Sequence, residues 1–261
     1  MSKPALVVVT GSSGRIGRAV VAELAARGHQ VRGFDRAPMP GLSECVTGSV
    51  TDAAAVRRAV EGASVLIHLA ATPDDAEFER DLVPNNIIGL HRVLEAARLA
   101  GVQRLILASS GQVNDSQQET GPWPARATDP ITPRYWYAAT KVFMESIGRS
   151  YAQRHGMSVI AARLGWCPRT VEQVREIASE ERFQDVYLSP GDAGRFFACA
   201  VEAPADVKFA IVYATSKTPR TERLDLEPAR RLLGFQPAEQ WPQGVEVILG
   251  RPLDPGEFAV A

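Results

Sequence analysis

The chain has 261 residues, of which 45% are hydrophobic and 23% are charged, as in an average globular protein. Its 29 basic and 30 acidic residues leave a formal net charge of −1, which argues against a strongly basic face that binds nucleic acid. The three cysteines and four histidines lack metal-binding spacing, and neither a signal peptide nor an apolar run of roughly 20 residues is present, so we expect a cytoplasmic protein without metal or membrane contact.

Short apolar runs alternate with longer amphipathic segments along most of the chain. The apolar runs predict strands at residues 5–10, 30–34, 44–47, 64–69, 104–109, 158–163 and 209–214. The amphipathic segments predict helices at residues 15–27, 52–60, 85–100, 135–155, 171–181, 190–202 and 225–233. Strand–helix alternation indicates parallel strands joined by right-handed crossovers. The predicted fold class is therefore α/β, a doubly wound parallel sheet of the Rossmann type.

The chain is predicted to divide near Pro168. Residues 1–168 carry the regular alternation and form the expected dinucleotide-binding domain. Residues 169–261 are less regular and are expected to form a small, discontinuous substrate-side region, partly interleaved with the first. The longest predicted irregular stretch, residues 111–133, is rich in Pro, Thr, Asp and Gln, and a loop of that length is usually functional.

A glycine-rich turn lies between the first predicted strand and the first predicted helix. It reads GSSGRIG over residues 11–17. The first glycine permits a tight turn, the second lets the backbone approach a pyrophosphate, and the third lets the helix pack closely on the strand. The following helix N-terminus offers N–H groups to an anion. The turn predicts a bound dinucleotide.

Asp35 ends the second predicted strand, 18 residues after Gly17. A carboxylate at this place can accept hydrogen bonds from the adenosine ribose and repels a 2′-phosphate, which favours NAD over NADP. Arg32 and Arg36 leave the alternative open, because a neighbouring guanidinium could hold that phosphate.

Tyr137 and Lys141 stand four residues apart on one face of a predicted helix. A tyrosine that acts as a base at neutral pH needs its pKa lowered by about three units, and a nearby lysine cation shifts it in that direction. Ser110 follows the fifth predicted strand, where doubly wound sheets place their ligands, and its hydroxyl can bind a substrate oxygen. These residues predict the catalytic set Ser110, Tyr137 and Lys141.

Together these motifs resemble the extended short-chain dehydrogenase/reductase family, also called the NAD-dependent epimerase/dehydratases. The resemblance covers about residues 5–168 and includes the TGSSGRIG turn, HLAA at 68–71, NIIG at 86–89 and YAATK at 137–141. It implies that Lys141 also binds the nicotinamide ribose, that Ser110 orients the substrate, and that Asn86 supports the central helix and a proton path. It further implies a homodimer formed through two helices, one of which carries Tyr137.

The resemblance also implies two sets of binding residues. The set expected to bind NAD is Gly11, Ser13, Gly14, Arg15, Ile16, Gly17, Asp35, Arg36, Ser49, Val50, Leu69, Ala70, Ala71, Asn86, Tyr137 and Lys141. The set expected to bind substrate is Pro73, Ser110, Gly111, Gln112 and Arg182.

Among the smaller family members, the chain is most similar to the uronate dehydrogenases, which oxidise the anomeric carbon of a free hexuronic acid. By that similarity Arg182, seven residues before Ser189, is the candidate that grips a substrate carboxylate. The chain departs from the group at Gly111 and Gln112, where those enzymes have Asn and His, and at Pro73, where they have Ser. Acidic residues follow at 74, 75 and 77, and carboxylates near the pocket disfavour an acidic substrate.

Three functions are therefore considered. The first is an NAD-dependent oxidoreductase that acts on a free sugar or sugar acid and releases NADH. The second is an epimerase or dehydratase that reoxidises its NADH within each turnover. The third is a dinucleotide-sensing protein without turnover, which would not need Ser110, Tyr137 and Lys141.

Overall fold

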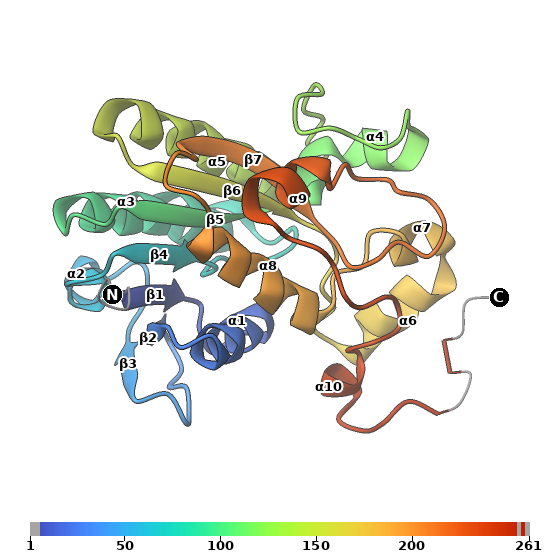
Figure 1. Cartoon of the computed structure of the whole chain (residues 1–261), viewed down its shortest axis with the longest axis horizontal. Helices are drawn as coiled ribbons and strands as arrows, with labels where there is room; N and C mark the ends of the chain where they lie inside the picture. Colours follow the sequence, from blue (N-terminus) through green and yellow to red (C-terminus); the bar gives the residue numbers. More distant parts are fainter. Residues whose placement is uncertain (1–5, 255–256, 259–261) are drawn as a thin grey trace.

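Seven parallel strands form one sheet in the computed structural model, which describes residues 6–254 and 257–258 (Figure 1). In spatial order they are β3 (Glu44–Thr47), β2 (Gln30–Asp35), β1 (Leu6–Thr10), β4 (Val65–His68), β5 (Arg104–Ser110), β6 (Ser158–Leu164) and β7 (Phe209–Ala214). Each predicted strand is present within two residues at either end, and Ala5 lies outside the described residues. The predicted fold class is confirmed.

Helices cover both faces of the sheet. Val7 and Val9 of β1 pack on one face with α1 (Arg15–Ala26), α8 (Pro190–Glu202) and α9 (Glu227–Leu233). Val8 packs on the other face with α2 (Ala53–Val60), α3 (Leu90–Leu99) and α5 (Trp136–His155). Successive side chains of a strand point to opposite faces, so a strand covered on both sides is apolar throughout. This accounts for the unbroken LVVV run of β1.

The helix predicted at residues 85–100 begins earlier than expected. A wide, π-type helix, η1 (Phe78–Gly89), precedes α3 and contains Pro84. Proline lacks an N–H donor and is disfavoured inside a helix. The structure starts it before the proline because the Glu77 carboxylate accepts from the N–H groups of Glu79 and Arg80, and because Leu82 is fully buried.

The expectation of an irregular stretch at residues 111–133 is wrong for its first part. A 3₁₀ turn, η2 (Gly111–Asn114), leads into α4 (Asp115–Thr120). The Ser110 hydroxyl accepts from the Gln112 N–H and caps the turn, and an acidic residue begins α4 where the helix dipole favours it.

The later part of the chain contributes to both the sheet and the region beyond it. β7 and α8 belong to the sheet and its helix layer. Figure 1 shows α4, α6 (Val171–Ser179), α7 (Glu181–Gln184) and α10 (Glu246–Leu249) beyond the carboxyl ends of the strands. The division at Pro168 stays a prediction.

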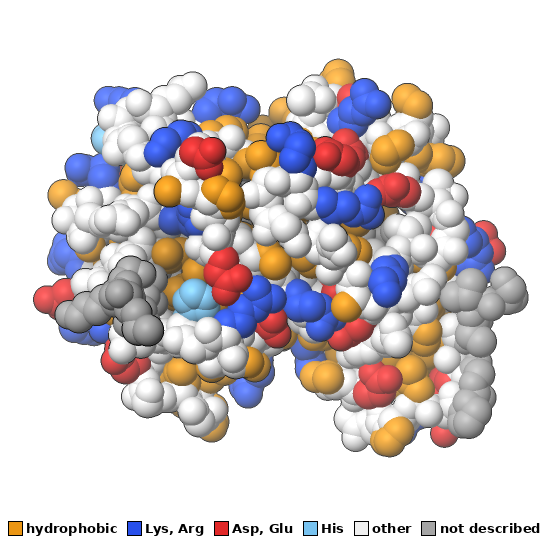
Figure 2. Space-filling view, viewed as in Figure 1, with side chains coloured by type: hydrophobic (Ala, Val, Ile, Leu, Met, Phe, Trp, Pro, Cys, Tyr) orange, Lys and Arg blue, Asp and Glu red, His pale blue; other side chains and the backbone are white. Residues whose placement is uncertain are grey.

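The surface carries mixed charge. On the face shown in Figure 2, Lys and Arg side chains are interspersed with Asp and Glu side chains. Within residues 6–254 and 257–258, no helix combines the length and the apolar character needed to cross a bilayer.

A buried ion pair joins α5 to the sheet. The Arg163 guanidinium on β6 donates two hydrogen bonds of 2.8 Å to the two Glu145 carboxylate oxygens on α5. Both side chains are at most 6% exposed. Glu145 also accepts a 2.6 Å hydrogen bond from Ser109 of β5, so one carboxylate holds the helix against two strands.

We expect Glu145→Gln to lower the free energy of unfolding by about 3–5 kcal/mol, because it leaves a buried cation uncompensated. Urea unfolding followed by circular dichroism measures this loss. The control is Glu23→Gln, which breaks the exposed Glu23–Arg27 pair and should cost less than about 1 kcal/mol. Equal losses in both variants would contradict the assignment of the buried pair.

Candidate active site

A cavity of about 1020 Å³ lies along the carboxyl edge of the sheet. Its walls come from residues at the ends of several strands, including Asp35 of β2, Ser110 of β5 and Leu164 of β6. Parallel strands end at one edge of a sheet, so residues far apart in sequence meet there. The cavity extends from the glycine turn at one end to Tyr137 at the other.

The glycine turn is closed so tightly that two of its glycines cannot be replaced. Gly11 has a φ of +74°, and a Cβ there would stand 2.9 Å from the Ala70 nitrogen. A Cβ on Gly17 would stand 2.1 Å from the Gly11 oxygen. Gly14 is the N-cap of α1 and lines the cavity, so the N-terminus of α1 is open to an anionic group.

Asp35 is held in place beside this turn. One carboxylate oxygen accepts from the Ser13 N–H at 3.0 Å, and the other accepts from the Ala37 N–H at 3.1 Å. Arg32 points elsewhere, to Glu44 at 3.0 Å and to two backbone carbonyls. Arg36 lines the cavity and is the guanidinium available to a 2′-phosphate.

The three predicted catalytic residues meet at the other end of the cavity. The Ser110 hydroxyl lies close enough to the Tyr137 phenol to lower its pKa. The Lys141 ammonium donates to the Ala108 oxygen at 2.8 Å and lies 5.3 Å from the centre of the Tyr137 ring. The i,i+4 spacing therefore places the phenol and the ammonium beside the end of β5.

Burial shifts the pKa values of both groups. It raises the pKa of Tyr137 to about 12, with a further rise from the Asp74 charge that the Arg169 cation and the Ser110 hydrogen bond oppose. It lowers the pKa of Lys141 to about 8. The expected lowering of the phenol pKa is therefore not present in the protein alone, and it requires additional positive charge in the cavity.

His68, the last residue of β4, is buried beneath the cavity. Its Nδ1 lies 2.8 Å from the Thr10 hydroxyl, which also accepts from the Ala70 N–H. Burial and then the Lys141 charge lower the pKa of His68 to about 3, so the imidazole is uncharged at neutral pH. It supports the loop after β4.

Most of the predicted binding residues line the cavity. From the NAD set these are Gly11, Ser13, Gly14, Arg15, Ile16, Gly17, Asp35, Arg36, Ser49, Val50, Leu69, Ala70, Ala71, Tyr137 and Lys141, and from the substrate set Pro73, Ser110, Gly111 and Gln112.

Two predicted residues lie elsewhere. Asn86 is buried behind the wall, where its amide binds both backbone groups of Thr72 and donates to the Thr140 hydroxyl at 3.2 Å. It therefore ties the loop after β4 to α5. Arg182 is outside the cavity lining and pairs with Glu119 and Glu180.

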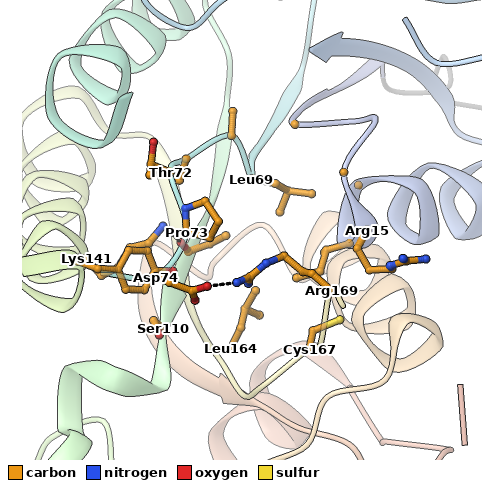
Figure 3. A pocket seen from close by; sticks show the side chains of 18 of the residues that line it. Arg15, Leu69, Thr72, Pro73, Asp74, Ser110, Lys141, Leu164, Cys167 and Arg169 are labelled. Carbon is orange, nitrogen blue, oxygen red and sulfur yellow. Dashed lines mark hydrogen bonds and ion pairs between the residues drawn. The ribbon is translucent and has the colours of Figure 1, made fainter. Parts of the chain in front are cut away.

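Residues after β6 complete the cavity and were not predicted. Arg169 crosses from this segment to form an ion pair with Asp74 (Figure 3). Trp166 and Phe183 line the same side, with ring centres 5.0 Å apart. Trp166 and Arg169 lie just beyond the end of β6, and this position was the available signal, since that edge carries ligands in this fold.

These residues fit a dinucleotide. The turn presents backbone N–H groups, Asp35 presents an ordered carboxylate, and Tyr137 stands at the far end of a continuous cavity. Within residues 6–254 and 257–258, no group of three His, Cys, Asp or Glu side chains is placed to hold a metal ion. The arrangement is typical of a dinucleotide-dependent oxidoreductase, with Ser110, Tyr137 and Lys141 as the candidate catalytic residues.

The chain belongs to the NAD dependent epimerase/dehydratase family, whose model matches residues 7–166. It is 33% identical over 251 residues to L-arabinose 1-dehydrogenase (NAD(P)(+)) of Haloferax volcanii, covering 90% of this chain and 97% of that protein. It is 30% identical over 216 residues to uronate dehydrogenase of Pseudomonas syringae pv. tomato, covering 80% of this chain and 74% of that protein. The structure of a mutated uronate dehydrogenase superposes with a TM-score of 0.75 at 26% identity, covering 97% of this chain and 90% of that chain.

The comparisons confirm the predicted family and its similarity to uronate dehydrogenases. The protein is an NAD-dependent dehydrogenase of the short-chain dehydrogenase/reductase type, and NAD is its cofactor.

We expect Asp35→Asn to raise the ratio of kcat/KM with NADP to kcat/KM with NAD by about tenfold or more, because the charge that repels a 2′-phosphate is removed. Initial rates with each cofactor measure the ratio. Arg36→Gln is the opposing control, and it should lower any activity with NADP. A ratio unchanged in Asp35→Asn would show that this carboxylate does not select the cofactor.

We expect Lys141→Met to unfold at the same or a higher temperature at pH 7, although its activity is lost. Holding this lysine as a cation costs about 3 kcal/mol, since its pKa falls from 10.5 to about 8. The unfolded chain binds more protons between those pH values, so wild-type stability rises with pH there, and the variant should lack that rise.

Thermal unfolding scanned from pH 7 to pH 10 tests this. Lys208→Met, an exposed control, should behave as wild type in both stability and activity. A lower unfolding temperature for Lys141→Met at pH 7 would show that the ammonium contact with Ala108 outweighs the cost of burial.

Proposed function

We propose that the protein oxidises a free sugar or sugar acid at its anomeric carbon and releases the reduced cofactor. The observation that carries the proposal is the convergence of Ser110, Tyr137 and Lys141 at one end of a cavity whose other end is built for a dinucleotide. The names of the two similar dehydrogenases, for L-arabinose and uronate, support a free sugar or sugar acid as the substrate class.

The residues divide the reaction between them. Ser110 is placed to hydrogen-bond the substrate hydroxyl that becomes a carbonyl, and it also touches Tyr137. The Tyr137 phenolate takes the proton of that hydroxyl, while the two electrons of the broken C–H bond leave with the hydride. When bound, NAD supplies the acceptor for the hydride and a positive charge near the phenol.

Lys141 serves as a positioning cation for the tyrosine. Its ammonium is tied to the Ala108 oxygen, which orients its remaining N–H groups toward the cavity that it lines. By family resemblance these groups bind the nicotinamide ribose. With a phenol pKa of about 12 in the protein alone, proton removal at neutral pH depends on positive charge gathered beside Tyr137.

The homodimer stays a prediction, and its expected interface is the layer of helices on the α5 side of the sheet. Ile88 of η1 and Phe143 of α5 are 41% and 40% exposed. An apolar side chain exposed on each of these packed helices is consistent with the predicted two-helix interface.

The test is production of NADH from a panel of free aldoses and uronic acids. We expect one NADH for each sugar oxidised, and a fall in kcat of at least about hundredfold in Tyr137→Phe while NAD still binds, because the proton acceptor is lost and the rest of the cofactor site remains. NADH absorbance and fluorescence titration of NAD binding give the two readouts. Epimer formation without NADH would favour the recycling alternative, and NAD binding with no activity on any sugar would favour the sensor.

A further inference from the structure

Asp74 and Arg169 form an ion pair across the substrate side of the cavity. Arg169 reaches from the segment after β6 toward Asp74 on the loop after β4, while Arg15 points away (Figure 3). The Gln173 amide of α6 lies 3.5 Å from the same Asp74 oxygen. The Arg169 and Asp74 side chains are 36% and 55% exposed, so each keeps hydrogen-bonding capacity toward the cavity.

The backbone of Asp74 is held in an unusual conformation. Its φ is +60°, which among the described non-glycine residues is shared only with Phe258. The loop is fixed just before this point, because Asn86 binds both backbone groups of Thr72. A non-glycine residue held in this region costs free energy, and such residues concentrate at ligand clamps. The backbone on either side of this point therefore holds Asp74 in the wall of the cavity, which its side chain lines.

Both charges act on the reacting end of the cavity. The Asp74 charge raises the pKa of Tyr137 and the Arg169 charge lowers it. A sugar bound between Tyr137 and the ion pair would therefore have its remaining hydroxyls near Asp74 and Arg169.

Among the described residues, the other cations that line the cavity are assigned to the cofactor and not to the sugar. Lys141 is tied to Ala108, and Arg15 and Arg36 line the end of the cavity at the glycine turn and at Asp35. Arg182 is already bound by two carboxylates outside the cavity.

Carboxylates predominate on the substrate side. Asp75 and Glu176 line it, together with Asp81 and Asp115, which pair with Arg80 and Arg134. A carboxylate or phosphate on the substrate would meet these like charges and would compete with Asp74 for Arg169.

We propose that the Asp74–Arg169 pair determines specificity for uncharged aldoses and excludes uronates and sugar phosphates. The Asp74 carboxylate accepts hydrogen bonds from sugar hydroxyls, and the Arg169 guanidinium donates to their oxygens. A neutral polyol satisfies both groups and leaves the ion pair intact. This inference rests on the proposed sugar oxidation and names the substrate class of that site.

The test compares Asp74→Asn with wild type on glucose and glucuronate, and on galactose and galacturonate, with NAD. Asparagine tolerates a positive φ, so the substitution removes the charge and keeps the loop. We expect kcat/KM for the aldoses to fall by about tenfold or more and kcat/KM for the uronates to rise, because Arg169 is released to bind a carboxylate.

Arg169→Gln is the second variant, and it should weaken aldose oxidation without any gain on uronates. Asp206→Asn and Arg175→Gln make the same charge changes at exposed positions outside the cavity and should match wild type. Unchanged thermal unfolding and an unchanged KM for NAD show that each variant is folded and binds cofactor.

The possible outcomes separate the two proposals. The specificity role of the pair is wrong if wild type has a higher kcat/KM for the uronates. It is also wrong if Asp74→Asn lowers kcat/KM equally for aldoses and uronates, or changes it for neither. In each of these cases sugar oxidation stands. If wild type produces NADH from none of the four sugars or from a wider panel that includes pentoses, the proposed function is wrong, and the specificity role falls with it.

Discussion

The active site depends on the register between helix α5 and the end of strand β5. Three residues of the helix, spaced four apart, each contact one of the last three residues of the strand. Tyr137 meets the Ser110 hydroxyl, Lys141 donates to the Ala108 oxygen at 2.8 Å, and Glu145 accepts from Ser109 at 2.6 Å. A slip of one residue in either element would break all three contacts, so the catalytic geometry follows from how the helix is docked.

The packing of α5 on the sheet is stabilised by a buried ion pair that lies away from Tyr137. Glu145 is also the partner of Arg163 on β6, and this buried pair anchors the helix two turns beyond Tyr137. Near the cavity the same helix holds a phenol and an ammonium whose burial opposes their charged forms. The site thus keeps two groups in environments that favour neutrality, and the packing of α5 on the sheet offsets the cost.

The two ends of the cavity are built by different means. At the cofactor end, backbone geometry dominates, because Gly11 and Gly17 allow the N-terminus of α1 to approach the neighbouring loop. At the substrate end, side chains from the loop after β4 and from the segment after β6 meet across open space in the Asp74–Arg169 pair. The cofactor end therefore depends on backbone geometry, whereas the substrate end depends on a few loop side chains that can change without altering the fold.

Local patterns along the chain were enough to predict the elements that depend on near neighbours. Continuous apolar runs indicated strands covered on both faces, the glycine spacing indicated the turn at residues 11–17, and the i,i+4 spacing placed Tyr137 and Lys141 on one helix face. These predictions hold because a turn or a helix face depends on residues only a few positions apart. The strand pattern holds because helices cover both faces of every central strand.

Contacts between distant loops, by contrast, were set by the three-dimensional fold. It extended the central helix through Pro84, bound Arg182 to Glu119 and Glu180 outside the cavity, and brought Arg169 across to Asp74. Residues 74 and 169 are 95 positions apart and belong to segments without periodic pattern. No local rule pairs two such charges, because their distance is set by how the whole sheet orders its strands and where each strand ends.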